Sequence, residues 1–286
     1  MKDILRLAVQ KSGRLSEDSM RLLNDCDIHF NRSNRKLKSK AENFPLELLY
    51  LRDDDIPSYV ADNVAEIGIV GENVVAELKK PVEIIERLGF SKCRLAIAAP
   101  RSSDIRDVSD LQGLNIATSY PAILTDFLKE RNVKASLHEI SGSVEIAPSI
   151  GLAEAVCDLV SSGSTLISNG LQEIETILHS QAVLIAGKEM PPAKSKTLEE
   201  LLFRIKSVLR AKRFKYILMN APNHVLDEVT RILPGIKSPT IMPLAIEGWS
   251  SVHSVIREDR FWEIIQELKT LGVEGVLVFP IENMIQ

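Results

Sequence analysis

The chain of 286 residues contains few cysteines, and Cys26, Cys93 and Cys157 are odd in number, widely spaced and flanked by apolar residues. Such a set forms neither a disulfide framework nor a zinc motif, so we expect buried free thiols in a reducing compartment. The five histidines share no metal-ligand spacing, and we interpret them as structural. No apolar stretch approaches the ~18 residues of a membrane span, and the N-terminus lacks the apolar core of a signal peptide. These absences predict a cytoplasmic protein without a membrane partner.

An excess of positive charge is also absent, because 35 lysines and arginines face 39 acidic residues and the net charge is −4. The chain therefore offers no basic field for nucleic acid, and we expect no nucleic-acid partner. Each lysine and arginine has to be considered individually. The apolar fraction of 45% is ordinary for a globular protein, and the length fits two or three domains.

Apolar strand-like runs alternate with amphipathic helical segments through the first two-thirds of the chain, which predicts an α/β fold with mostly parallel sheets. Strands are expected at residues 5–9, 46–51, 67–70, 82–88, 95–99, 115–118, 136–140 and 156–160, and helices at 16–26, 56–63, 121–131 and 145–154. Residues 175–186 form another extended run, residues 188–196 are expected to be a loop, and residues 198–210 have helical spacing.

The last ~75 residues have a different pattern, in a segment of ordinary size for a small domain. Strands are expected at 214–219, 240–244, 249–257 and 275–279, and helices at 225–233 and 260–271. This βαββαβ order is that of the ferredoxin-like fold. Small modules of this kind often pair and bind effectors.

A strand that ends in a turn rich in hydroxyl groups is the most informative motif. Its apolar residues 155–157 lead to Asp158, and a turn with four hydroxyl side chains and one glycine follows: Ser161, Ser162, Gly163, Ser164 and Thr165. Backbone N–H groups and hydroxyls at the start of a helix suit a phosphate, and glycine lets the backbone approach it. Asp158 is placed to reach sugar hydroxyls. The same residues are also ordinary N-cap and turn residues, so the motif alone leaves both interpretations open.

The motif lies within a longer frame that resembles the signature of the ATP phosphoribosyltransferase family. The frame comprises Glu145, Gly151, Ala153, Val156, Asp158, Ser162, Gly163, Thr165 and Leu166. Similar segments occur in the expected order at residues 10–15, 52–57, 66–71, 93–95 and 117–121, and residues 237–240 resemble the regulatory domain of the long form. The chain is thus identified as a member of the long-form family.

The resemblance implies a bilobal catalytic region similar to periplasmic binding proteins, followed by the ferredoxin-like regulatory domain. The expected boundaries are residues 1–90 with 180–211 for the first lobe, 91–179 for the second lobe and 212–286 for the regulatory domain. The implied reaction transfers the phosphoribosyl group of phosphoribosyl pyrophosphate to N1 of ATP and releases pyrophosphate. It is the first step of histidine biosynthesis, with feedback inhibition by histidine. The implied cofactor is Mg²⁺, bound mainly through substrate phosphates with Asp158 as a candidate protein ligand, and the implied assembly is a homohexamer built from dimers.

The resemblance also assigns roles to individual residues. Asp158 and the turn 161–165 would bind phosphoribosyl pyrophosphate. The groups that would contact ATP or pyrophosphate are Lys11, Gly13, Arg14, Arg52, Gly71, Glu72, Arg94 and Tyr120. The candidates for the histidine effector site are Asn220, Ser238, Pro239, Thr240 and Leu244.

Simpler interpretations compete with several of these roles. Lys11 and Arg14 could lie on a solvated loop, and Glu72 and Arg94 could be surface charges. Arg52 has a stronger basis, because parallel sheets bind ligands where their strands end. Asp55 precedes Ile56-Pro57 and is expected to cap a helix rather than to bind metal.

Three other functions remain to be distinguished from the implied one. A solute-binding protein would share the bilobal fold without catalysis. A purine-salvage type of phosphoribosyltransferase usually has two adjacent acidic residues before its phosphate loop, whereas Asp158 stands alone here. A regulatory protein with an inactive catalytic region is the third alternative.

Overall fold

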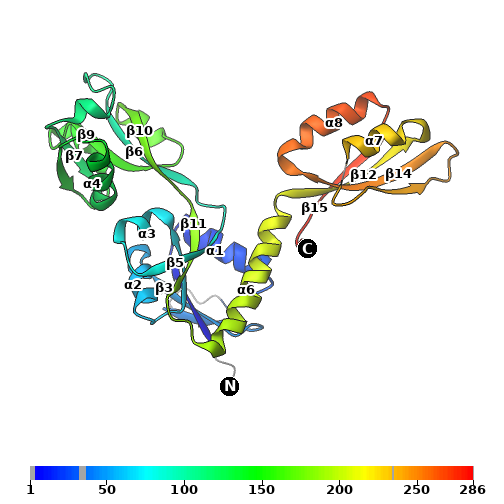
Figure 1. Cartoon of the computed structure of the whole chain (residues 1–286), viewed down its shortest axis with the longest axis horizontal. Helices are drawn as coiled ribbons and strands as arrows, with labels where there is room; N and C mark the ends of the chain where they lie inside the picture. The colour runs from blue at the N-terminus through cyan, green and yellow to red at the C-terminus, as the bar shows by residue number, and fades with distance from the viewer. Residues whose placement is uncertain (1–3, 32–36, 234, 286) are drawn as a thin grey trace. The chain divides into compact units, whose positions relative to one another are not determined.

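The computed structural model describes residues 4–31, 37–233 and 235–285, so the first three residues of the predicted first lobe lie outside the described part. The chain divides into two compact units (Figure 1). One comprises Met1–Arg21 with Ile28–Leu198, and the other comprises Leu22–Asp27 with Glu199–Gln286. Among the described residues, none of the helices has the length and hydropathy that a membrane crossing requires.

The first unit contains a six-stranded sheet, the first sheet, with β1 near its centre. β1 pairs in parallel with β3 and β4, whereas β11 pairs in antiparallel with β4 and β5. The order is β2 (Lys38–Lys40), β3 (Leu46–Leu51), β1 (Leu5–Gln10), β4 (Ile67–Gly71), β11 (Ala182–Gly187) and β5 (Val82–Arg87). Its helices are α1 (Arg14–Asp25), α2 (Ile56–Ala61) and α3 (Glu72–Leu78). The apolar strands are buried because α2 packs against β1, β4 and β11.

A second, five-stranded sheet completes this unit. Its order is β10 (Leu171–Ser180), β6 (Cys93–Pro100), β9 (Ala155–Val160), β7 (Asn115–Thr118) and β8 (Ser136–Glu139). α4 (Pro121–Glu130) covers the face that bears Leu95 and Cys157, and α5 (Ser164–Ser168) contributes Leu166 to the face that bears Ala96 and Val156. Both faces of the inner strands β6 and β9 are therefore buried, which explains why these two strands are mainly apolar rather than alternating.

The chain passes from the first sheet to the second between β5 and β6, and returns between β10 and β11. In each sheet most strands run in one direction, with antiparallel strands beside a parallel core. The predicted bilobal α/β class is thus confirmed. The boundaries at 90, 179 and 211 stay predictions.

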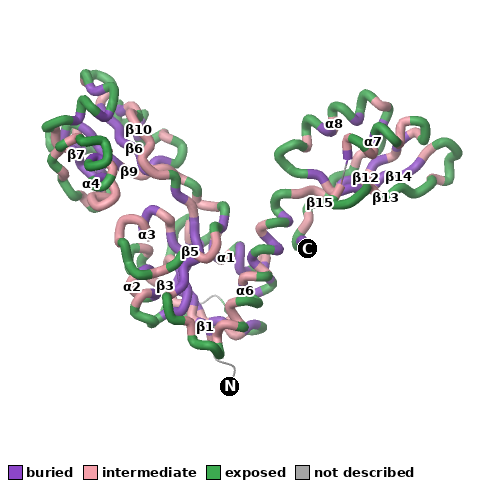
Figure 2. The backbone as a smooth tube through the Cα atoms, in the orientation of Figure 1, coloured by how far each residue is buried: buried purple, intermediate pink, exposed green. Residues whose placement is uncertain are grey.

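The second unit contains α6 (Pro192–Ala211) beyond residue 198 and a four-stranded antiparallel sheet. The order of that sheet is β13 (Thr240–Pro243), β14 (Trp249–Arg257), β12 (Phe214–Pro222) and β15 (Glu274–Pro280). α7 (Leu226–Ile232) and α8 (Phe261–Thr270) lie on one face of it, and the core between them includes Ile217, Val252 and Leu268 (Figure 1). The predicted ferredoxin-like order is confirmed. In Figure 2 buried positions alternate with intermediate ones along the second half of β12 and make up much of β14, whereas much of α8 is exposed.

Four segments differ from the expectations. The helix expected at 145–154 is absent, and two 3-10 turns, Val144–Ile146 and Pro148–Ile150, stand in its place. Pro148 cannot donate a backbone hydrogen bond and Gly151 has a left-handed φ of 73°, so an α-helix cannot continue through this segment. The loop expected at 188–196 is wrong from Pro192 onward, where α6 begins, and α3 and β2 were not predicted.

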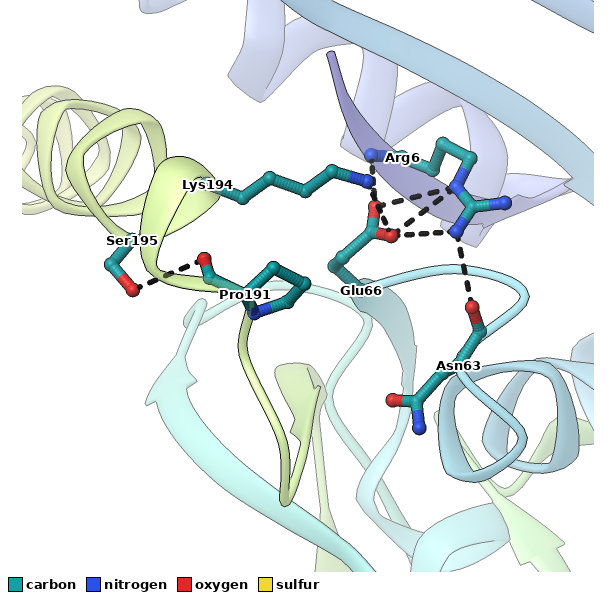
Figure 3. Close-up of polar contacts among 6 residues, drawn as sticks. All are labelled: Arg6, Asn63, Glu66, Pro191, Lys194 and Ser195. Atoms are coloured by element: carbon teal, nitrogen blue, oxygen red, sulfur yellow. Dashed lines mark hydrogen bonds and ion pairs between the residues drawn. The ribbon is translucent and has the colours of Figure 1, made fainter. Parts of the chain in front are cut away.

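A buried ionic cluster connects the start of α6 to the first sheet (Figure 3). Glu66, only 4% exposed, accepts hydrogen bonds from Arg6 Nη2 at 2.6 Å and from Lys194 Nζ at 2.7 Å. The backbone N–H of Arg6 also donates to Glu66 Oε2 at 2.7 Å. Burial alone would raise the pKa of Glu66, but the hydrogen bonds from Arg6 and Lys194 outweigh it and the pKa is lowered.

Candidate functional site

The hydroxyl-rich turn lies between β9 and α5, as the sequence indicates. Gly163 has a left-handed φ of 82°, which favours glycine, and its carbonyl accepts the first helical hydrogen bond from Ile167. Leu166 is buried and anchors the short helix, whereas the hydroxyl residues are exposed. The Oγ atoms of Ser162 and Ser164 lie 3.0 Å apart. The turn therefore exposes its hydroxyls and the first N–H groups of α5 to solvent, while the buried side chain of Leu166 holds the helix in place.

Asp158 is half-buried near the end of β9, opposite Ala96 of β6. Burial raises the pKa of its carboxyl group, the hydrogen bond from the N–H of Leu159 at 2.7 Å lowers it, and the nearby carboxylate of Glu145 raises it further. The net direction is upward. A carboxylate in this position is a hydrogen-bond acceptor for a polar ligand at the end of the strand.

The donor set limits how the protein could hold a metal ion. Within residues 4–31, 37–233 and 235–285, no three His, Cys, Asp or Glu side chains gather into a metal site. Asp158, with the carboxylate of Glu145 nearby, lies in the strand that leads to the exposed hydroxyls of the turn. That set fits Mg²⁺, which usually takes one or two protein carboxylates and completes its shell with phosphate oxygens and water.

Arg94 lies beside the turn, but its charge has a partner that the sequence did not indicate. Its guanidinium forms an ion pair with Glu173 of β10, with Nη2 2.6 Å from Oε2, and Nη1 donates to the carbonyl of Ser161 at 3.4 Å. Arg94 holds the pKa of Glu173 below its ordinary value, although burial opposes the shift. Arg94 therefore contacts the backbone of the turn at Ser161, while its charge is paired with Glu173.

Lys11 and Arg52 follow the ends of two paired parallel strands of the first sheet. Gln10 of β1 is in register with Leu51 of β3, and the N–H of Lys11 donates to the carbonyl of Leu51 at 2.9 Å. Lys11, Gly13 and Arg14 are exposed, and Gly13 has a φ of 94°. The predicted cationic groups of this lobe therefore lie together at the C-terminal ends of the parallel strands β1 and β3, the side of the sheet where ligands bind in α/β folds.

The short acidic segment after β3 differs from the expectation. Arg52 pairs with Asp54 at 2.9 Å, and its side chain is 78% exposed. Asp55 occupies the N-cap position of α2, but its side chain makes no capping hydrogen bond. A 3-10 turn over Asp53–Asp55 gives Asp55 a helical backbone, φ −80° and ψ −27°, rather than the extended one that capping requires. The expected cap is therefore wrong.

Gly71 and Glu72 lie where β4 leads into α3, on the other side of β1. The carboxylate of Glu72 pairs with Arg87 of β5 at 2.6 Å. Gly71 is needed for space, because a Cβ there would lie 2.3 Å from Oδ1 of Asn73. The charge of Glu72 is therefore already paired, and it is not a free surface charge.

Tyr120, at the start of α4, links groups of both lobes. Its hydroxyl oxygen accepts a hydrogen bond from Asn73 Nδ2 at 3.1 Å. Burial raises the pKa of Tyr120, the bond from Asn73 opposes this, and the carboxylates of Asp158 and Asp53 raise it further. One carboxylate from each lobe, Asp53 after β3 and Asp158 in β9, thus contributes to the raised pKa of Tyr120. Sequence reasoning missed Asn73, and no local signal marks it.

The effector candidates lie in the second unit on and beside β12 and β13. Asn220 is opposite Ser251 of β14, and Thr240 is opposite His253, both on the sheet face away from α7 and α8. His253 is held by Tyr216 through Nδ1 at 2.7 Å and by Ser251 through Nε2 at 3.1 Å. Three further candidates lie in the adjoining turns: Ser238, Pro239 and Leu244.

These observations define the class of the protein: a bilobal α/β ligand-binding fold, with a hydroxyl-rich turn in one lobe and a cationic strand edge in the other, joined to a ferredoxin-like module. The family model for ATP phosphoribosyltransferase matches residues 52–207, and that for the C-terminal domain of HisG matches residues 211–283.

Similar proteins agree with these matches. The chain is 57% identical over 286 residues to an ATP phosphoribosyltransferase of Cytophaga hutchinsonii, with both chains fully covered, and 56% identical over 282 residues to one of Phocaeicola vulgatus, covering 99% and 100%. A solved ATP phosphoribosyl transferase (HisG:HisZ) complex from Thermotoga maritima has a TM-score of 0.64 at 23% identity, over 72% of this chain and 99% of that one. The chain belongs to the ATP phosphoribosyltransferase family, in its long form.

Proposed function

We propose that this enzyme transfers the phosphoribosyl group of phosphoribosyl pyrophosphate to N1 of ATP, which is the first step of histidine biosynthesis. Adenine N1 donates its lone pair to the anomeric carbon, and the bond from that carbon to the pyrophosphate oxygen breaks with the electron pair leaving on pyrophosphate. The nucleophile carries no proton to remove, so the reaction needs no strong general base. Family membership over the full chain is the observation that carries this proposal.

The turn 161–165 is the proposed site of the sugar 5′-phosphate. Its exposed hydroxyls and the backbone N–H groups at the start of α5 can donate to phosphate oxygens. The carboxylate of Asp158 accepts from the ribose hydroxyls. When bound, Mg²⁺ neutralises the pyrophosphate oxygens as the leaving group departs, and Asp158 is the candidate protein ligand.

ATP and pyrophosphate are assigned to the edge formed by the ends of β1, β3 and β4. Lys11, Arg14 and Arg52 supply positive charge there, and Gly13 lets the backbone approach a phosphate. Because Arg52 is already paired with an exposed carboxylate, binding would exchange that partner for a phosphate. The side chain of Tyr120 is assigned to the region between adenine and ribose.

Three residues, Gly71, Glu72 and Arg94, keep supporting roles in this proposal. Gly71 makes room for Asn73, Glu72 holds Arg87, and Arg94 holds the turn through the carbonyl of Ser161. These contacts position the proposed site without requiring that each side chain touch a substrate.

Regulation and assembly extend the proposal to the second unit. Histidine would bind at Asn220, Ser238, Pro239, Thr240 and Leu244 and inhibit the enzyme, which would act as a cytoplasmic homohexamer built from dimers. The match to the C-terminal domain of HisG supports this assignment. Inhibition requires two global states to which histidine binds with different affinity.

Release of pyrophosphate from ATP and phosphoribosyl pyrophosphate with Mg²⁺ tests the activity directly. The variant Thr165→Ala removes one charge-assisted hydrogen bond, roughly 1.5–3 kcal/mol, and should raise the KM for phosphoribosyl pyrophosphate more than that for ATP. Ser168→Ala is the matched control, because Ser168 is an exposed hydroxyl at the far end of the same helix. Equal effects of the two variants would place the phosphate elsewhere.

A further inference from the structure

A buried polar network joins the two lobes behind the proposed site. The backbone N–H of Asn73 donates to Ser180 Oγ at 3.0 Å, Ser180 Oγ donates to Asn73 Oδ1 at 2.8 Å, and Asn73 Nδ2 donates to the Tyr120 oxygen at 3.1 Å. Asn73 is 4% exposed and Ser180 is 5% exposed. Ser180 is the last residue of β10, directly before the chain returns to the first sheet, and it is in register with Cys93 at the start of β6.

This network fixes which way the Asn73 side chain faces. The hydroxyl of Ser180 accepts from the backbone N–H of Asn73 and donates its single proton to Oδ1 of the same residue. The amide NH₂ of Asn73 must then face Tyr120. The phenol oxygen is therefore an acceptor toward Asn73.

The direction of that bond determines where the phenol proton can go. Because Asn73 supplies the hydrogen, the O–H proton of Tyr120 is not used in this contact. Among the residues that the structure describes, no acceptor takes it. That proton is therefore available to a bound ligand, and the carboxylate of Asp158 is one of the groups that raise the pKa of Tyr120.

The surroundings are shaped to hold Asn73. A side chain at position 71 would collide with Oδ1 of Asn73 at 2.3 Å, and Gly71 leaves that space open. A buried amide with each of its polar atoms bonded is costly to disturb and cannot easily rotate. Asn73 is thus a rigid support at the start of α3.

We propose that Asn73 is a positioning residue that makes the Tyr120 oxygen an acceptor and so directs the phenol proton to an oxygen of bound phosphoribosyl pyrophosphate beside Asp158. The inference rests on the proposed function. It adds a role for a residue that touches no substrate, and it assigns the Tyr120 hydroxyl, rather than its ring alone, to substrate recognition.

Other contacts between the lobes provide the control. Glu77 of α3 accepts hydrogen bonds from the N–H groups of Ala122 and Ile123, and Lys79 pairs with Asp126 of α4. The side chains of Lys79 and Asp126 are both more than half exposed. Lys79→Ala therefore loosens the same two helices without changing the bond to Tyr120.

The variant Asn73→Asp distinguishes two roles of residue 73: setting the direction of the hydrogen bond to Tyr120, and merely linking the two lobes. An aspartate keeps the shape and still accepts from Ser180, but as a carboxylate it can only accept from Tyr120 and would take the phenol proton. If Asn73 only fastened the lobes, this charge-assisted bond would preserve activity. The inference expects the opposite, a fall in kcat/KM for phosphoribosyl pyrophosphate on the order of tenfold.

The full experiment measures pyrophosphate release in the full-length chain for the variants Asn73→Asp, Asn73→Ala, Tyr120→Phe, the double variant Asn73→Ala/Tyr120→Phe and Lys79→Ala. Each of the first three should lower kcat/KM for phosphoribosyl pyrophosphate about tenfold, with a smaller effect on the KM for ATP. The double variant should be no worse than Tyr120→Phe alone, because both act through one hydroxyl. Thermal unfolding of each variant shows whether it is folded, and Lys79→Ala should resemble the wild type.

Several results would overturn the inference. Wild-type kinetics in Asn73→Asp, additive losses in the double variant, or a loss confined to the KM for ATP would each do so while leaving the proposed function intact. If Asn73→Asp does not fold, the comparison of kcat/KM among Asn73→Ala, Tyr120→Phe and the double variant still tests the inference. A wild-type chain that releases no pyrophosphate would instead overturn the proposed function and this inference with it.

Discussion

Replacing Glu66 by glutamine tests whether the ionic cluster at the start of α6 stabilises the first unit. The carboxylate accepts from Arg6 and Lys194 at 2.6 and 2.7 Å and from one backbone N–H. Glutamine keeps one acceptor oxygen but carries no charge, and its NH₂ group faces the backbone donor of Arg6, so the two cations lose their counter-charge. Removing one partner of a buried ion pair costs about 3–5 kcal/mol. Because the side chain of Arg6 is 35% exposed and can reach water, we expect the lower end, about 3 kcal/mol.

Calorimetry of the full chain measures this effect, since it can resolve the transitions of separate units. For a unit of this size, 1 kcal/mol corresponds to roughly 2–4 °C, so the transition of the first unit should fall by about 6–12 °C. Glu175→Gln is the matched control, because Glu175 pairs with Arg131 at 3.4 Å and its side chain is 36% exposed, against 4% for Glu66. A fall no larger than that of the control would mean that desolvation cancels the attraction and would refute the estimate.

The same cluster predicts a pH dependence. The pKa of Glu66 in the folded chain lies below its ordinary value of 4.5, so the stabilisation is fully present above pH 4.5 and is lost as the pH falls through the folded-state pKa. The difference between the wild type and Glu66→Gln should therefore shrink below pH 4.5. A difference that grows on acidification would contradict this sign.

Further predictions concern the proposed site and the effector domain. Asp158→Asn should weaken binding of phosphoribosyl pyrophosphate, measured by titration, more than binding of ATP; equal weakening would remove Asp158 from the sugar. Arg52→Glu should raise the KM for ATP or for pyrophosphate in the reverse reaction, and unchanged kinetics would exclude Arg52 from the site. Gly71→Ala should lower kcat/KM and the unfolding temperature together, because the new methyl group displaces the neighbouring amide. Thr240→Val should raise the histidine concentration needed for half-inhibition of pyrophosphate release, and an unchanged concentration would place histidine elsewhere.

Most strands could be predicted because their signal is local. β3, β7 and β14 have the expected bounds, since each is an apolar or alternating run between turn residues. α3 could not be predicted in the same way, because it has only seven residues and its N-cap, Gly71, supplies no side-chain hydrogen bond. The helix expected at 145–154 shows the reverse error: apolar spacing suggested it, but Pro148 and Gly151 fix a backbone that excludes it.

The sequence predicted the site residues that directly follow a strand, but it did not predict the contacts between residues that are far apart in the chain. The turn 161–165 and the position of Arg52 follow from a strand and the residues after it. The partner of Arg94 is Glu173, 79 residues away, and Asn73 meets Ser180 across 107 residues. Charge and polarity in the sequence show which side chains need a partner, but only the three-dimensional fold shows which partner each receives.

The interleaving of the two sheets has a consequence for synthesis of the chain on the ribosome. The second sheet comes from one continuous stretch, β6 to β10, and can be completed once residue 180 has emerged. The first sheet begins earlier but lacks β11, which lies between β4 and β5 and ends at Gly187. Until then β4 and β5 have no strand between them, and their unpaired edges can bind other chains. Of these two sheets, the one that begins first is thus completed second, and its unpaired edges are exposed during the interval in which the second lobe folds.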